Sequence, residues 1–202
     1  KKDILNLVYL AEYFDLHEVA SFWEGVVNIN NWHQKRITEI VIKKLFGTIT
    51  GKKIIVLGFA FKANTNDTRE SAAIKICKEL IDEGAILVIH DPKVNPKQIE
   101  KDLQIKQTLK KQNEEETSLK NQIGKWQFSK SLDIFDDAHA ILILTEWEEY
   151  KYIDWHKAVK KMVKPSWVFD SRSIINAKEV KEAGINLWRL GDGSQKKEVS
   201  NF

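Results

Sequence analysis

The stretch Lys53-Ile54-Ile55-Val56-Leu57-Gly58 decides the fold, because it is a short β-branched run between lysines and a glycine. Such a run predicts a strand that is buried in a parallel sheet. Apolar residues at helical spacing over residues 68–83 predict a helix, and residues 85–92 form a second apolar run that ends at a proline. Together these segments have the length that a right-handed strand–helix–strand crossover needs.

The same alternation continues along the chain. Further strands are predicted at residues 126–128, 140–144, 167–170 and 187–190. Further helices are predicted at residues 132–137, 150–162 and 177–183, with a weak one near 98–107. Strands and helices that alternate in this way predict an α/β fold, a doubly wound, mostly parallel, Rossmann-like sheet with helices on both faces.

The residues before the first strand have a different pattern. Their apolar residues recur at helical spacing without a proline, which predicts an all-helical segment over residues 1–47 with a long helix through 25–45. The chain opens at Lys1-Lys2-Asp3-Ile4-Leu5, inside an amphipathic pattern and without an initiator methionine. We therefore expect a piece of a longer protein, with a helical segment followed by the sheet domain at residues 48–193.

Two segments have polar composition: one lies inside the sheet domain and the other is the end of the chain. Residues 94–125 contain no aromatic residue and are dominated by Lys, Gln, Glu and Asn. Such composition buries too little apolar surface to offset its ordering entropy, so we expect a mobile insertion centred on residues 112–116. Residues 194–202 are expected to be a frayed tail.

The overall composition narrows the function classes. Lys and Arg number 32 against 29 acids among 202 residues, so no polybasic arm for nucleic acid organises the chain. No apolar run approaches the ~20 residues that cross a bilayer, so no membrane partner is expected. The single cysteine fits a reducing compartment and predicts a cytoplasmic location. The five histidines lack metal-ligand spacing, so no metal is predicted.

The loop after the first strand is the first candidate site, because ligands of open parallel sheets bind at the carboxyl ends of strands. It differs from a dinucleotide cradle: Ala60 and Ala63 stand where G-x-G-x-x-G has its second and third glycines. Asp91, the candidate ribose-binding acid, also comes later than the usual spacing of about 20 residues. We therefore favour a nucleotide held by loop side chains over NAD bound across this sheet. Lys62 and Arg69 supply positive charge suited to phosphate.

Other candidates in this region have a simpler structural explanation. The stretch Thr65-Asn66-Asp67-Thr68 is expected to provide the N-cap of the following helix. Cys77 lies inside that helix, which favours a buried, inert thiol over a nucleophile. His90 and Trp147 each stand at or just after a strand end, where packing is the default and a ligand contact is the alternative.

Three stretches carry a family resemblance. Gly58-Phe59-Ala60-Phe61-Lys62, followed by Asp67-Thr68-Arg69-Glu70-Ser71, closely resembles the loop that opens the C-terminal domain of UDP-glucose 6-dehydrogenases. The resemblance continues through His90-Asp91-Pro92-Lys93-Val94 and Thr145-Glu146-Trp147. The opening residues after Lys1 look like those that follow the catalytic cysteine motif of this family. The resemblance is closer to the UDP-glucose form than to the GDP-mannose form.

The resemblance implies an NAD-dependent oxidation of the C6 alcohol of UDP-glucose to UDP-glucuronate, through a covalent intermediate on a cysteine. In that family an N-terminal Rossmann domain holds NAD and a long central helix forms the homodimer, with higher oligomers also possible. The C-terminal sheet helps to hold UDP-glucose through its UDP part. By the same resemblance, residues 1–47 match the central segment and residues 48–193 match the UDP-sugar-binding domain.

The resemblance also assigns roles to six residues of this chain. Phe61, Lys62 and Arg172 match substrate-binding positions. Lys2 and Arg69 match positions on the cofactor side, and Asp3 matches a catalytic aspartate that organises water. The catalytic cysteine is expected upstream of residue 1, so the chain alone is expected to be inactive.

Three alternatives stay open from the sequence. One is a nucleotide-binding module that performs no chemistry, which makes the same prediction for this chain and differs only in the parent protein. Another is a related nucleotide-sugar dehydrogenase such as the GDP-mannose type. A purely structural unit, in which residues 3–46 pair with a second copy through their apolar stripe, is compatible with the first interpretation.

Overall fold

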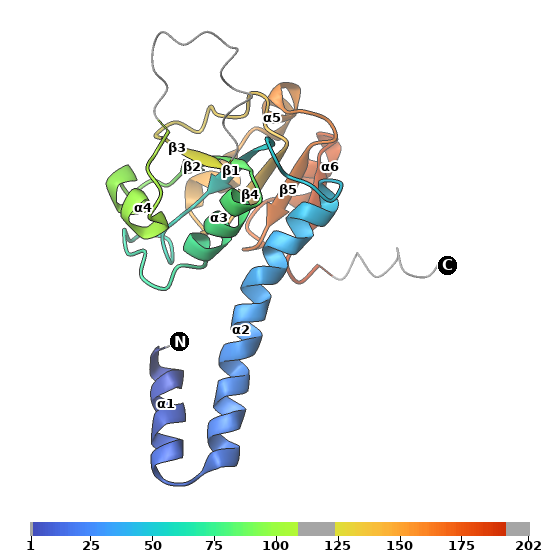
Figure 1. Ribbon diagram of the computed structural model, residues 1–202. Coiled ribbons are helices and arrows are strands. Elements are labelled where there is room, and N and C mark those ends of the chain that lie inside the picture. Colours follow the sequence, from blue (N-terminus) through green and yellow to red (C-terminus); the bar gives the residue numbers. More distant parts are fainter. Residues whose placement is uncertain (1, 109–123, 193–202) are drawn as a thin grey trace.

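The centre of the molecule is a six-stranded sheet in the order β3-β2-β1-β4-β5-β6 (Figure 1). The computed structural model describes residues 2–108 and 124–192, and within them every neighbouring pair of strands is parallel. The strands are β1 (Lys53–Leu57), β2 (Ile86–His90), β3 (Lys125–Ser129), β4 (Ala140–Ile143), β5 (Trp167–Asp170) and β6 (Asn186–Arg189). This order and direction confirm the predicted doubly wound, Rossmann-like sheet.

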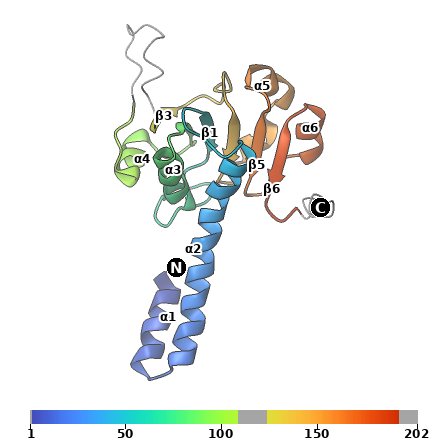
Figure 2. The same ribbon diagram turned by 45° about the vertical axis from the view of Figure 1, so that its right-hand side comes forward.

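Helices cover both faces of this sheet. Helices α3 (Ala72–Asp82) and α4 (Pro96–Leu103) follow β1 and β2, whereas α5 (Trp155–Lys161) and α6 (Ala177–Glu182) follow β4 and β5. The chain winds outward from β1 in one direction and from β4 in the other, so right-handed crossovers place the two pairs on opposite faces. Figure 2 shows α3 and α4 on one side of the domain and α5 and α6 on the other. Strands β1 and β4 are covered on both sides, which explains their continuous apolar sequences.

The register aligns the carboxyl ends of the central strands. Leu57, the last residue of β1, pairs with His90 of β2 and with Ile143 of β4. Ile143 in turn pairs with Asp170, the last residue of β5. The loops after these four strands therefore leave the sheet together at the carboxyl ends of the strands, around the switch point between β1 and β4. We call this end of the sheet the carboxyl edge.

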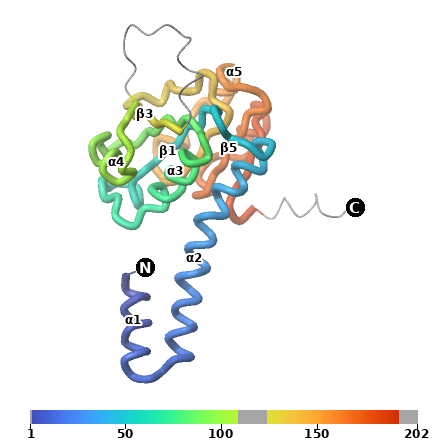
Figure 3. Tube along the Cα trace, in the orientation of Figure 1, coloured from blue at the N-terminus to red at the C-terminus, as the bar shows by residue number. Residues whose placement is uncertain are grey.

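The helical segment is a hairpin of α1 (Lys2–Tyr13) and α2 (His17–Lys44). The turn between them includes Asp15, which has a positive φ of 55°. Helix α2 runs through Gly25 and so confirms the expected long helix, although it begins eight residues earlier than residue 25, at His17. Figures 1 and 3 show the two helices side by side, with most of the hairpin standing away from the sheet.

The last part of α2 packs into the core of the sheet domain. Ile37, Val41 and Leu45 are buried and belong to the same core as the strands. The Thr38 hydroxyl donates to Glu79 Oε2 of α3 at 2.7 Å, which fixes α2 against that helix. Burying three aliphatic side chains of this size stabilises the junction by about 5 kcal/mol.

Two helix predictions need correction. Residues 132–137 are not helical; here the Lys53 ammonium donates to the carbonyls of Ile134 and Asp136. Six residues give a helix too few internal hydrogen bonds to compete with such contacts. The predicted helix at 150–162 is divided into a 3-10 turn, η2 (Glu148–Tyr152), and α5, because the Asp154 side chain caps α5 by accepting from Lys157 N.

Part of the predicted insertion at residues 94–125 is a helix. Helix α4 lies within the range expected to be an insertion, capped by Asn95 and anchored by the buried side chains of Ile99 and Leu103. The predicted centre of the insertion, at 112–116, and the predicted tail at 194–202 lie outside the described residues. In the part of the chain that is described, no helix is both long and apolar enough to cross a membrane.

Candidate functional site

The loop between β1 and α3 wraps over the carboxyl edge of the sheet. It starts at Gly58, whose φ of 92° and close approach to Thr145 leave no room for a side chain. Further along, Phe61 N donates to the carbonyl of Asp67 at 2.8 Å and closes the loop on itself. Ser71 ends the loop: its hydroxyl donates to the carbonyl of Phe59 and accepts from Ala73 N. The N-cap of α3 is therefore Ser71 and not a residue of the expected stretch 65–68, because only Ser71 precedes the helix directly.

Phe61 and Lys62 are exposed at this edge. The Phe61 side chain is 49% exposed, which is high for a large aromatic residue that follows two fully buried ones. Lys62 is exposed next to it, and its positive charge contributes to lowering the pKa of Asp67. The loop thus offers an aromatic face and an ammonium group side by side in sequence, at the place where sheets of this class bind ligands.

Arg69 is held by its own loop. Its Nε and one terminal nitrogen donate to the two oxygens of Asp67 at 3.0 and 2.8 Å. Hydrogen bonds from the Arg69 side chain and backbone hold the pKa of Asp67 down at about 2. The Arg69 side chain is 88% exposed, so the guanidinium is orientated but remains open to solvent. Thr65 supports the same turn by accepting from Asp67 N.

Arg172 leaves the end of β5 and reaches back to the end of β4. Its Nε donates to the carbonyl of Leu144 at 2.7 Å and lies 3.4 Å from Glu146 Oε2. Its backbone N–H donates to Asp170 Oδ1 at 3.0 Å, and Ile175 N donates to the other oxygen of that buried carboxylate. The register places this group at the same edge as the loop after β1, two strands away.

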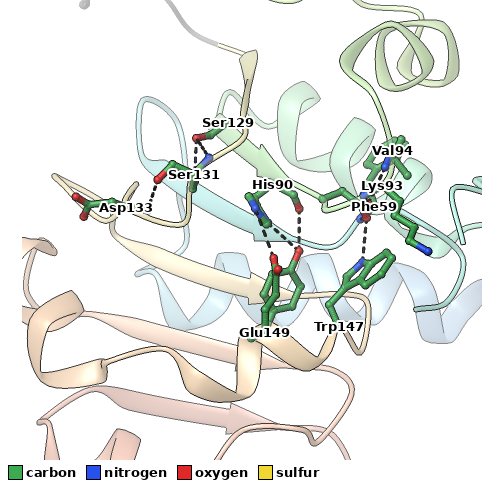
Figure 4. Close-up of polar contacts among 11 residues, drawn as sticks. Phe59, His90, Lys93, Val94, Ser129, Ser131, Asp133, Trp147 and Glu149 are labelled. Atoms are coloured by element: carbon green, nitrogen blue, oxygen red, sulfur yellow. Dashed lines mark hydrogen bonds and ion pairs between the residues drawn. The ribbon is translucent and has the colours of Figure 1, made fainter. Parts of the chain in front are cut away.

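Asp91 follows β2 directly and is buried, with 4% of its surface exposed. Its Oδ2 accepts from Phe59 N, Ala60 N and the Trp147 indole, and its Oδ1 accepts from Lys93 N and Val94 N. Figure 4 shows Phe59, Lys93, Val94 and Trp147 gathered around one point. Since five donors fill a carboxylate, Asp91 has no oxygen left for a ribose hydroxyl. Trp147 is buried in this network at 5% exposure, which confirms packing as its role here.

His90 is the last residue of β2 and, with Asp91, lines a surface cavity. Its Nδ1 lies 3.0 Å from the Tyr150 hydroxyl and its Nε2 lies 3.6 Å from Glu149 Oε1, as Figure 4 shows for His90 and Glu149. Burial lowers the pKa of His90, against the opposing effect of the Glu149 charge. The cavity has a volume of about 430 Å³ and is lined by His90, Asp91, Pro92, Lys93, Val94, Asn95, Pro96, Phe128, Lys130 and Glu149.

Lys2 and Asp3 lie in the first turn of α1 and are exposed. Figures 1 and 2 agree that α1 begins on the side of the sheet where the loop between β1 and α3 lies, shown in teal. The predicted site residues are therefore all on this side, but only Phe61, Lys62, Arg69 and Arg172 belong to the sheet edge itself.

Cys77 is fully buried in α3, and burial raises the pKa of its thiol. This confirms the expected burial of the thiol, and a buried thiol in apolar surroundings is expected to be inert. Among the described residues no three His, Cys, Asp or Glu side chains are grouped so that they could hold a metal ion.

The fold and the loops at the carboxyl ends of its strands define a doubly wound α/β domain of the kind that binds nucleotides, with a helical hairpin attached. A model of the UDP binding domain of the UDP-glucose/GDP-mannose dehydrogenase family matches residues 55–177. The chain belongs to this family.

Individual relatives agree with this assignment. The chain is 40% identical over 196 residues to UDP-glucose 6-dehydrogenase 2 of Arabidopsis thaliana, covering 95% of this chain and 40% of the relative. It is 38% identical over 203 residues to UDP-glucose 6-dehydrogenase of Drosophila melanogaster, covering 97% and 40%. The chain thus spans about two fifths of the length of these relatives.

A solved structure supports the fold independently. The structure of a UDP-glucose dehydrogenase from the archaeon Pyrobaculum islandicum superimposes with a TM-score of 0.66 at 22% identity. The superposition covers 93% of this chain and 36% of that one.

Proposed function

We propose that this chain is the part of an NAD-dependent UDP-glucose 6-dehydrogenase that holds the UDP portion of UDP-glucose. The observation that carries the proposal is the match of the family's UDP binding domain to residues 55–177, which include the exposed Phe61 and Lys62 and the Arg172 group. The names of the relatives favour UDP-glucose over a GDP-sugar as substrate. The reaction proposed for the whole protein converts UDP-glucose, two NAD+ and water to UDP-glucuronate and two NADH.

Each proposed substrate-binding residue has chemistry suited to one part of UDP. The exposed ring of Phe61 provides a face for the uracil base, and stacking of a base on an aromatic side chain contributes about 1–3 kcal/mol. The Lys62 ammonium suits a phosphate oxygen as a compact positive charge. The Arg172 guanidinium has donors beyond the Nε that it uses for Leu144 and can give them to a second phosphate or to the sugar.

The residues of this sheet do not fit NAD as its main site. Ala60 and Ala63 stand at the glycine positions of a dinucleotide cradle, and Asp91 has its oxygens filled by internal donors. NAD is proposed to bind mainly outside this sheet, with Lys2 and Arg69 lining its side of the site. Asp3 is proposed as the catalytic residue that orients water.

A binding experiment tests the proposed role of the edge. We expect UDP to bind the chain weakly in isothermal titration calorimetry, because a site shared with another domain has only part of its contacts. Lys62→Ala should weaken binding about tenfold, the value of one charged hydrogen bond. Lys178→Ala, which removes an exposed lysine of α6 that lies 3.8 Å from Glu182, is the matched control and should change nothing. Equal affinity of the wild-type chain and Lys62→Ala would remove Lys62 from the site.

The chain by itself is proposed to be inactive. Its single cysteine is Cys77, and a fully buried thiol of raised pKa cannot serve as the nucleophile of covalent catalysis. Mixing the purified chain with NAD and UDP-glucose should therefore give no NADH absorbance. Turnover above background would contradict this part of the proposal.

The hairpin is proposed to form a homodimer. Many large apolar side chains of the hairpin are exposed: Leu5, Leu7, Tyr9, Leu10, Tyr13, Phe14, Val19, Phe22, Ile29 and Trp32. A surface of this kind is covered in most proteins, and a second copy of the hairpin would cover it. Sedimentation at micromolar concentration should give a dimer or larger species, and a monomer would contradict the proposal. The single buried cysteine is compatible with the cytoplasmic location that we propose.

A further inference from the structure

Asp91 is a buried carboxylate that the proposed binding residues do not include. It stands directly after β2, where dinucleotide-binding sheets place the acid that holds a ribose. Here its surface is 4% exposed and it points to protein donors. A buried charge is costly unless it is fully hydrogen-bonded, so its surroundings indicate what it does.

The five donors to Asp91 come from three different loops of the carboxyl edge. Phe59 N and Ala60 N, at 2.7 and 2.9 Å, belong to the loop after β1. Lys93 N and Val94 N, both at 2.9 Å, belong to the loop after β2. The Trp147 indole, at 3.2 Å, belongs to the segment after β4. One side chain therefore joins the three loops that surround the switch point.

The carbonyls of Phe59 and Ala60 are also hydrogen-bonded. The Ser71 hydroxyl donates to Phe59 O at 2.8 Å, and the Thr145 hydroxyl donates to Ala60 O at 2.7 Å. Both residues that precede Phe61 are thus fixed at their N–H and at their C=O. Hydrogen bonds thus hold the buried half of the loop up to the point where Phe61 and Lys62 emerge.

We propose that Asp91 is a positioning residue that holds the loop after β1 in the shape needed to bind UDP. This rests on the proposed function, in which Phe61 and Lys62 contact UDP. The carboxylate acts through the Phe59 and Ala60 amides and does not touch the ligand itself. Because these hydrogen bonds exist before UDP arrives, the loop does not have to be ordered on binding, which preserves affinity.

The role requires a carboxylate and not merely a polar group. Asparagine has nearly the same shape, but one of its two terminal atoms is an NH2 group, which cannot accept from a backbone N–H. In Asp91→Asn, either the pair Phe59 and Ala60 or the pair Lys93 and Val94 therefore loses its acceptor. Leaving buried donors unpaired should loosen the loop locally.

Amide hydrogen exchange measured by NMR tests the positioning directly. In Asp91→Ala, which removes both acceptor oxygens, we expect exchange at Phe59 and Ala60 to rise at least about tenfold relative to the β1 amides, with a displaced indole signal for Trp147. The UDP dissociation constant should rise about tenfold. Val180→Ala, a truncation at a fully buried position of α6, is the control: it should lower stability while leaving UDP affinity and the relative exchange of the loop unchanged.

Two results would overturn the proposal. One is exchange that rises evenly in the loop and the strands, as a merely structural residue would cause. The other is a loosened loop with unchanged UDP affinity. If the wild-type chain binds no UDP, the proposed function fails instead, and the exchange data still decide whether Asp91 anchors the loop. If Asp91→Ala does not fold, Trp147→Phe removes one donor to the Asp91 oxygen that also accepts from Phe59 and Ala60, and it should weaken UDP binding about threefold. Unchanged affinity in Trp147→Phe would count against the proposal.

Discussion

Replacing Gly58 with alanine is predicted to be one of the most damaging single-methyl changes in this protein. Its φ of 92° is a conformation that L side chains rarely adopt. A Cβ built there would lie 2.4 Å from Thr145 Cβ, 2.6 Å from its hydroxyl oxygen and 2.7 Å from its backbone nitrogen. Thr145 cannot move away easily, because it is fully buried and its hydroxyl donates to Ala60 O.

The expected cost is the sum of two effects. A positive φ costs a non-glycine residue about 1–2 kcal/mol, and an extra methyl group in a packed interior costs about 1–3 kcal/mol. Gly58→Ala should therefore lower the free energy of unfolding by about 2–5 kcal/mol. Two other glycines separate the effects. Gly47 has a φ of 78° with no atom within 4 Å of a Cβ, so Gly47→Ala should cost about 1–2 kcal/mol.

Replacing the third glycine with alanine is predicted to raise the free energy of unfolding instead. Gly25 lies inside α2 and a Cβ there meets nothing within 4 Å, so Gly25→Ala should stabilise by about 0.5–1 kcal/mol. The assay is urea unfolding followed by circular dichroism, with all variants at one protein concentration. A cost for Gly58→Ala equal to that of Gly47→Ala would refute the close approach of Gly58 and Thr145.

Two further predictions concern titration and reactivity. Burial lowers the pKa of His90 below its usual 6.5, so the unfolded chain takes up a proton that the folded chain does not. The free energy of unfolding should therefore fall as the pH drops below about 6.5. His90→Gln should flatten this pH dependence, whereas His156→Gln, at an exposed histidine, should not. A wild type and a His90→Gln variant that lose stability in parallel would contradict the prediction. Cys77 should resist iodoacetamide in native buffer and react in urea, and rapid native labelling, read by mass spectrometry, would contradict its burial.

The strands could be predicted from the sequence because the central ones are buried on both faces. That environment demands apolar residues at every position, as in Lys53–Leu57 and Ala140–Ile143, and leaves a continuous run to recognise. The helix expected at 132–137 was wrong for the opposite reason. Its conformation depends on Lys53, which is about 80 residues away in sequence and reaches the carbonyls of Ile134 and Asp136.

The site was predictable only in part. Lys62 can be predicted from its charge in the loop after the first strand, whereas Phe61 is indicated by the family resemblance alone. The role of Asp91 could not be found, because its donors lie 31, 32 and 56 residues away as well as nearby. The only local signal was an acid directly between an apolar strand and a proline. In the same way, the contact of Arg172 with Leu144 spans 28 residues and becomes visible only when β4 and β5 are paired.

A UDP titration followed through backbone amide signals tests the central claim most directly. If the carboxyl edge binds UDP, the signals that move should be those of the loop between β1 and α3 and of residues 171–175 after β5. GDP at the same concentration should move them less. No displacement at saturating UDP, or displacements confined to the cavity beside His90 and Lys130, would contradict the account.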